Sequence, residues 1–197
     1  MAIIVVGGSG RGVGKTALVC GLIAVLPELS WTAVKITAHE HSTSEPVWEE
    51  ETPGQGSDTA RYLAAGAKRA FLLTALDEAN FPLVLDGLWS AIGRDSHVIF
   101  ESNRIVHHLR PDLCLLVCRG PDSADDKSSF QQAVPFADAL IEHAEFDQML
   151  EGAFEDKKGS GPIFHVASFE RISPEMRLWL REKLLTARAH NEEHRAR

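Results

Sequence analysis

Residues 2–26 read AIIVVGGSGRGVGKTALVCGLIAVL, in which a short apolar run leads through five glycines into a second apolar segment. The run at 2–6 is rich in β-branched residues and predicts a strand, whereas the apolar residues of 16–26 recur at helical spacing. Between them, SGRGVGKT at 9–16 differs from the phosphate-binding pattern G-x-x-x-x-G-K-[ST] only in having Ser9 at the first glycine position. A strand, a glycine-rich loop and a helix in this order predict a site for the phosphates of a nucleotide.

Each residue type in this loop has a chemical role in binding phosphate. Glycines let the backbone turn tightly and aim its N–H groups inward, where the positive end of the following helix also points. Lys15 would reach the β- and γ-phosphates, and the Thr16 hydroxyl would bind Mg²⁺. Because Gly8 and Gly10 flank Ser9, we expect them to absorb the turn. We predict that the phosphates are bound by Ser9, Gly10, Arg11, Gly12, Val13, Gly14, Lys15, Thr16 and Ala17. The alternative is a glycine-rich connection with a solvated lysine.

Length and composition narrow the function classes. With 197 residues and 44% hydrophobic content, residues 1–197 are expected to form a single domain. The formal net charge of −8, without a cluster of Lys and Arg, argues against nucleic-acid binding. No apolar stretch near the start is long enough for a membrane span and no signal-type segment is seen, which predicts a cytoplasmic protein that does not bind membranes. Cys20, Cys114 and Cys118 lie in apolar segments, which favours buried thiols.

The rest of the chain alternates between strand and helix patterns. Helices are expected from Ser57 or Asp58 to near Gly66, over 77–92, and after Ser173, which would be an N-cap. Short apolar runs predict buried strands at 31–36, 69–74, 97–101, 113–118, 135–141 and 162–166. This alternation predicts an α/β three-layer sandwich around a mostly parallel sheet, the P-loop NTPase fold, with the ligand at the carboxyl ends of the strands.

A long polar segment at 37–56 is acidic and interrupted by Pro and Gly, and we expect it to be an irregular loop. So long a loop in a compact domain calls for a functional explanation. Its first part carries His39 and His41, but a zinc site would need further Cys or His ligands nearby. Contact with phosphate or substrate and plain solvent exposure are both open for the two histidines. If the loop closes over a nucleotide, its acidic part, which includes Glu49 and Glu50, should face water or a partner.

Two carboxylates are candidates for the metal side of the phosphates. Glu101 ends the apolar run 97–101, where P-loop proteins keep a carboxylate for Mg²⁺ or its water; alternatively, it caps the next helix. Asp58 follows the long polar loop and could reach the metal or the γ-phosphate; alternatively, it is a helix cap. We predict Mg²⁺ binding by Thr16, Asp58 and Glu101, and we take Lys15, Asp58 and Glu101 as candidate catalytic residues.

Three segments together resemble the family of molybdopterin-guanine dinucleotide biosynthesis protein B (MobB). They are GGSGRGVGKTALVCGLI at 7–23, VKITAHEHS at 34–42 and GSDTARYLAAGAKRAFLL at 56–73. The resemblance implies a dimeric P-loop GTP-binding protein with an accessory role in molybdenum cofactor biosynthesis, whose partners would be a pterin cofactor or a cofactor-biosynthesis protein. It also implies that Gly12, Gly14, Lys15 and Thr16 hold the phosphates and Mg²⁺, with Asp58 near the γ-phosphate. The chain departs from the family at Glu101, which precedes Ser102-Asn103 where the family usually has glycine.

These observations predict Mg²⁺-dependent binding and slow hydrolysis of a purine nucleoside triphosphate, GTP or ATP. Residues 125–128, DDKS, follow a predicted strand where many GTPases bind guanine, but they do not match the N-K-x-D order. Two alternatives stay open. One is a small-molecule kinase or ATP-dependent ligase whose 37–56 loop closes over an acceptor. The other is an adaptor that binds nucleotide without turning it over.

Overall fold

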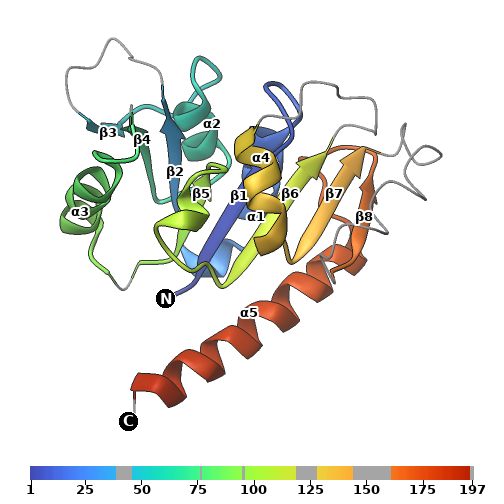
Figure 1. The fold of residues 1–197 in the computed structure, drawn as a ribbon. Helices are drawn as coiled ribbons and strands as arrows, with labels where there is room; N and C mark the ends of the chain where they lie inside the picture. The colour runs from blue at the N-terminus through green and yellow to red at the C-terminus, as the bar shows by residue number, and fades with distance from the viewer. Residues whose placement is uncertain (39–45, 76, 95, 119–127, 144–160, 196–197) are drawn as a thin grey trace.

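The computed structural model describes residues 1–38, 46–75, 77–94, 96–118, 128–143 and 161–195. Its centre is a sheet of eight strands in the order β3-β4-β2-β5-β1-β6-β7-β8 (Figure 1). Neighbouring strands are parallel except for the β3–β4 pair at one edge. The strands are β1 (Ile3–Gly8), β2 (Thr32–Thr37), β3 (Val47–Glu50), β4 (Arg69–Thr74), β5 (Val98–Glu101), β6 (Leu113–Cys118), β7 (Ala139–His143) and β8 (Ile163–Val166).

Helices cover both faces of the sheet, as Figure 1 shows for α1 and α4. The first face carries α1 (Lys15–Val25), α2 (Asp58–Ala64) and α5 (Pro174–Arg195), and the second carries α3 (Phe81–Ile92) and α4 (Ser128–Ala133). Short 3-10 turns occur at η1 (Pro27–Leu29), η2 (Ile105–His107) and η3 (Val134–Phe136). The predicted three-layer α/β sandwich is therefore confirmed. Within the ranges described, no helix is both long enough and apolar enough to cross a membrane.

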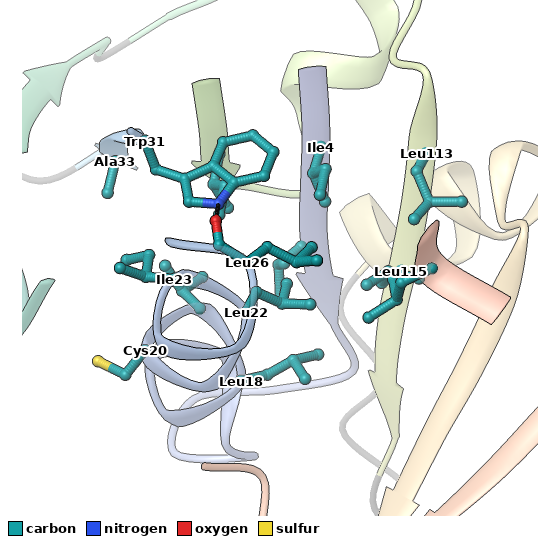
Figure 2. Close-up of a cluster of buried hydrophobic side chains, with 14 of the residues drawn as sticks. Ile4, Leu18, Cys20, Leu22, Ile23, Leu26, Trp31, Ala33, Leu113 and Leu115 are labelled. Atoms are coloured by element: carbon teal, nitrogen blue, oxygen red, sulfur yellow. Dashed lines mark hydrogen bonds between the residues drawn. The ribbon is translucent and has the colours of Figure 1, made fainter. Parts of the chain in front are cut away.

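The core between α1 and the sheet follows from the alternation of the strands. Ile4 and Val6 of β1 point to the α1 face, whereas Val5 between them points to the α3 and α4 face. Figure 2 shows this core, in which the Trp31 Nε1–H donates a 3.0 Å hydrogen bond to the carbonyl oxygen of Leu26. The bond gives a buried indole its polar partner at the point where α1 ends. It thereby joins α1 to the start of β2.

The expected buried thiols are also confirmed. Cys20, Cys114 and Cys118 are free and buried. Burial raises the pKa of Cys20 to about 11 and that of Cys114 to about 12. Both groups are therefore neutral thiols at physiological pH, in line with a role in packing.

One expected element was wrong within 37–56, because residues Val47–Glu50 form strand β3. Val47 and Trp48 are partly buried, and the pairing with β4 is reinforced where Arg69 donates to both carboxylate oxygens of Glu49, at 2.6 and 2.7 Å. Glu50 accepts hydrogen bonds from Ser57 and Thr59. Glu49 and Glu50 therefore form hydrogen bonds within the protein itself. His39 and His41 lie outside the described residues, as do positions 125–127.

Two other boundaries differ from expectation. The strand expected at 135–141 corresponds to β7, which begins only at Ala139. The residues before it, Val134–Phe136, form a 3-10 turn that has Pro135 near its N-terminus. Proline has no N–H to donate to a central strand, so the sheet begins after it. The helix expected at 77–92 begins at Phe81. Asp77 lies in the turn before this helix, where its carboxylate accepts hydrogen bonds from the backbone N–H and the side-chain amide of Asn80.

Candidate functional site

The candidate site lies where strands β2, β5 and β1 end side by side. These three strands are neighbours in the sheet, and Glu101 of β5 is the register partner of both Val6 in β1 and Lys35 in β2. Because the strands are parallel, the loops that follow them emerge at the same edge. Segments far apart in the sequence therefore meet around Glu101.

The phosphate loop connects β1 to α1 and makes its turn at two glycines. Gly12 and Gly14 have φ of 71° and 109°, in the left-handed region that favours glycine. A Cβ at Gly14 would also lie 2.2 Å from the Phe169 ring, so both conformation and space require glycine there. Helix α1 begins at Lys15, and its first N–H groups have no partners within the helix. This arrangement is the one expected for anion binding.

Ser9 is accommodated for a different reason from the one expected. Among the non-glycine residues described, only Ser30 has a positive φ, so Ser9 has an ordinary backbone conformation. It is 2% exposed, and its N–H donates a 3.0 Å hydrogen bond to the carbonyl of Val117. The left-handed turn is made at Gly12 and Gly14, and not at the glycines that flank Ser9. Gly8 is required for space, since a Cβ there would lie 2.8 Å from Val13 and 3.0 Å from Lys15.

Asn103 fastens the start of the phosphate loop to the end of β5. Its Oδ1 accepts a 2.7 Å hydrogen bond from the Gly8 N–H, and its Nδ2 donates to the Gly8 carbonyl at 3.0 Å and to Ser129 Oγ at 3.3 Å. A Cβ at Gly7 would lie 2.6 Å from the same Oδ1. Sequence reasoning registered Asn103 only as a departure from the MobB pattern. In the structure its side-chain amide forms hydrogen bonds with both the N–H and the carbonyl of Gly8, the last residue of β1.

The other loop residues lie as follows. The Lys15 ammonium donates a 2.6 Å hydrogen bond to the Gly10 carbonyl, so it is held inside its own loop. Arg11 is exposed at the turn, whereas Val13 is buried in the core beneath it. Ala17 is in the first turn of α1. The predicted phosphate-binding residues thus form one continuous loop and helix start.

Glu101 is the centre of a buried polar cluster. Its side chain is 3% exposed, and Oε2 accepts hydrogen bonds from Thr16 Oγ1 at 2.7 Å and from Tyr62 Oη at 2.5 Å. Oε1 accepts from Lys35 Nζ at 2.7 Å, and the same ammonium pairs with Asp58 Oδ2. The cluster therefore joins β5, α1, α2 and β2. The three predicted metal-side residues, Thr16, Asp58 and Glu101, are brought together as expected.

The capping alternatives do not fit this geometry. The turn η2 that follows β5 has Arg104 at its N-cap and no side-chain cap bond, so Glu101 does not cap it. Helix α2 is capped by Ser57, whose Oγ accepts from the Ala60 N–H at 3.0 Å, as one of the two sequence alternatives predicted. Asp58 is the first helical residue, and its carboxylate is directed to Lys35.

The charges of the cluster support one another. Burial lowers the pKa of Lys35, but the Glu101 carboxylate and the hydrogen bonds with Asp58 and Glu101 outweigh it, and the net shift is upward. Burial raises the pKa of Asp58, but the hydrogen bond from Lys35 and the positive charge of Lys35 lower it by more. Thr16 makes a smaller contribution in the same direction, and the net shift is downward. Burial and then the Glu101 charge raise the pKa of Tyr62 well above its usual value. At neutral pH the cluster holds an ammonium, a carboxylate at Asp58 and a neutral phenol.

Two carboxylates and a hydroxyl are hard oxygen donors, the set that Mg²⁺ prefers when it keeps several waters. In the portion of the chain that the structure describes, no group of three or more His, Cys, Asp and Glu side chains is arranged to hold a metal ion. The oxygen donors of Thr16, Asp58 and Glu101 would suit Mg²⁺ bound jointly with phosphate oxygens.

Lys35 and Tyr62 were missed as members of the site. For each of them, a feature of the sequence could have indicated a place in the site. Lys35 is a lysine in the otherwise apolar strand TAVKIT, near its carboxyl end, and a charge in such a strand calls for a buried partner. Tyr62 is four residues after Asp58 and hence on the same side of α2. What the sequence lacked was the strand order that sets Lys35 beside Glu101.

Comparison with solved structures decides the fold. HypB from Helicobacter pylori, solved in complex with nickel, matches with a TM-score of 0.58 at 17% identity over 96% of this chain and 88% of that chain. The apo form of LpxK from Aquifex aeolicus, solved in complex with ATP, matches with a TM-score of 0.51 at 17% identity, over 83% of this chain and 53% of that chain. The fold is that of the P-loop NTPases.

A MobB protein homolog from Bacillus stearothermophilus is also among the similar structures, with a TM-score of 0.46 and 21% identity over 94% of this chain and 99% of that chain. The P-loop NTPase fold implied by the sequence resemblance is confirmed by the HypB and LpxK matches. No family model matches the sequence. No curated protein matches it either.

Proposed function

We propose that this protein binds a purine nucleoside triphosphate together with Mg²⁺ and hydrolyses it slowly. The observation that carries the proposal is the convergence of a phosphate loop with the Thr16 hydroxyl and the carboxylates of Asp58 and Glu101 at one edge of the sheet. Solved proteins of the same fold support it, since LpxK was solved with ATP.

The chain's own groups would divide the work as follows. The N–H groups of residues 12–16 would bind the phosphate oxygens, because the start of α1 offers donors and positive potential. Lys15 would exchange the Gly10 carbonyl for the β- and γ-phosphates. Thr16, Asp58 and Glu101 would hold Mg²⁺ directly or through water, and the metal would neutralise charge on the phosphoryl group. Donors fixed before the reaction stabilise that charge best.

The sequence resemblance to MobB supports a narrower proposal, that the nucleotide is GTP and that the protein assists molybdenum cofactor biosynthesis as a cytoplasmic dimer. A pterin cofactor or a cofactor-biosynthesis protein would then be its partner. Turnover of GTP with added pterin, compared with turnover alone, tests this step. Stimulation by an unrelated small acceptor would favour the alternative of a small-molecule kinase or ligase. Binding without turnover in every case would favour the adaptor.

Substitution of Lys15 tests nucleotide binding itself. Lys15→Ala removes a charged hydrogen-bond donor to the phosphates and should weaken binding of the Mg²⁺ triphosphate roughly 10- to 100-fold in calorimetry. Lys68→Ala is the matched control, because Lys68 is exposed and directly precedes β4. It therefore lies at the amino ends of the strands, whereas the site lies at their carboxyl ends. GTP and ATP are titrated separately to determine the base preference. Equal affinity in the parent and Lys15→Ala would disprove the phosphate-loop assignment.

A further inference from the structure

Lys35 has the same partners that a metal ion would need. Its ammonium lies 2.7 Å from Glu101 Oε1 and pairs with Asp58 Oδ2, so a single cation joins the two carboxylates. The position is imposed by the sheet, because Lys35 and Glu101 are register partners on neighbouring parallel strands. Thr16, the third expected metal ligand, donates its hydroxyl hydrogen to Glu101 Oε2. Every expected metal ligand is therefore engaged inside the cluster.

An ammonium and a divalent cation cannot share these oxygens without strong repulsion. Two positive charges a few ångströms apart repel each other, and water and salt screen that repulsion poorly in a site that is mostly buried. The ammonium also cancels half of the negative charge of the two carboxylates, which is the charge that would attract a free metal ion. With Lys35 in this position, the cluster is a poor site for Mg²⁺ alone.

A nucleoside triphosphate changes this balance. Its phosphates bring several negative charges to the loop beside the cluster, so that a divalent ion and an ammonium can both be neutralised. The phosphates also offer Lys35 another anion. The side chains of Lys35 and Asp58 are 25% and 34% exposed, so the ammonium has room to move toward solvent and ligand without unfolding of the core.

We propose that Lys35 is a built-in cation that keeps divalent metal out of this site until a nucleoside triphosphate is bound. The inference rests on the proposed function and adds an order of events to it: metal enters with the nucleotide and not before it. Lys35 is thus a positioning residue that acts through Asp58 and Glu101. A lysine with a merely structural role would not alter the affinity for metal in this way.

The test measures binding of Mn²⁺, by loss of its free-ion electron paramagnetic resonance signal, in the absence of nucleotide. Lys35→Gln removes the charge and keeps a polar side chain, and it should bind one Mn²⁺ at least about tenfold more tightly than the parent. Lys68→Gln makes the same change in net charge at an exposed position far from the site, so it should match the parent. Equal Mn²⁺ binding by Lys35→Gln and the parent would overturn the proposal.

A second measurement tests the role of Lys35 without relying on the folding of Lys35→Gln. It also distinguishes failure of this proposal from failure of the proposed function. The parent is titrated with Mn²⁺ with and without a non-hydrolysable triphosphate analogue. We expect at least about tenfold tighter Mn²⁺ binding with the analogue, and tight stoichiometric binding without it would overturn the role of Lys35. A parent that binds no analogue would refute the proposed function instead, and the nucleotide-free comparison of Lys35→Gln with the parent would still decide the role of Lys35.

Discussion

Two carboxylates near the carboxyl ends of the strands, Glu101 and Glu78, each have several side-chain partners but differ greatly in their exposure to solvent. Glu101 accepts hydrogen bonds from Thr16, Lys35 and Tyr62, and its side chain is 3% exposed. Glu78, in the turn after β4, accepts from Arg104 Nε and pairs with His108 Nε2, each at 2.7 Å, but its side chain is 63% exposed.

The geometry of the exposed cluster is as well formed as that of the buried one. Arg104 also donates to the Ala75 carbonyl at 2.7 Å, and the His108 ring stacks on Phe81 with ring centroids 4.1 Å apart. Solvent nevertheless makes the two clusters unequal, because water and salt screen the Glu78 pairs, whereas Glu101 has exchanged its water for protein donors. We therefore expect burial, more than the number of partners, to determine what each cluster contributes to stability.

The largest effect on stability is expected from substitution of Glu101. Glu101→Ala leaves the Lys35 ammonium and the Tyr62 hydroxyl with one partner fewer inside the protein, and it should lower the free energy of unfolding by about 3–5 kcal/mol. Urea denaturation measures the loss. Glu78→Ala is the matched control and should cost less than about 1 kcal/mol. Equal losses in the two variants would show that burial does not distinguish the clusters.

A smaller effect is expected at Tyr62, which supplies one of the three hydrogen bonds to Glu101. Tyr62→Phe keeps the ring in the core and removes the hydroxyl, so it should lower the free energy of unfolding by about 1.5–3 kcal/mol, the usual range for a hydrogen bond to a charged group. Urea denaturation again gives the value. A loss near zero would mean that Glu101 is satisfied without the phenol.

The pH dependence of Tyr62 sharpens this result, because it is the only tyrosine in the chain. Its pKa is raised in the folded protein, so its contribution to stability is complete below the pKa of an unfolded tyrosine, about 10, and is lost as the pH rises above that value. Absorbance of the tyrosinate should therefore appear only well above pH 10, or together with unfolding. Half-ionisation near pH 10 in the folded protein would contradict the buried position of Tyr62.

The smallest effect is expected at Arg104. Arg104→Gln removes the cation from the exposed cluster and should change the free energy of unfolding by less than about 1 kcal/mol, a difference that shrinks as sodium chloride is added. Chemical denaturation with urea at low and high salt measures both values. A larger loss that persists in high salt would show that the Arg104 bond to Ala75 and its contact with Phe81 matter more than the charge.

Much of the fold could be predicted from the sequence because its signals are local. The strand, glycine-rich loop and helix of residues 2–26 are contiguous, and Glu101 is identified by its place at the end of an apolar run. Strand β3 could not be foreseen in the same way, since four residues in an acidic segment become a strand only through pairing with β4 and Arg69. The place of Lys35 in the cluster likewise depends on which strand lies beside β2, a property of the whole sheet.

The contact between Gly14 and Phe169 joins two parts of the chain that are synthesised at different times. A Cβ at Gly14 would strike the Phe169 ring, and a Cβ at Gly21 would come within 2.8 Å of the Phe169 carbonyl oxygen, so the connection from β8 to α5 is pressed against the first helix. The phosphate loop is therefore synthesised well before residues 169–170, which support it. Contacts between such distant parts of a sequence form slowly. Under the proposed function, the nascent chain should gain affinity for nucleotide only after residues 169–170 have been synthesised.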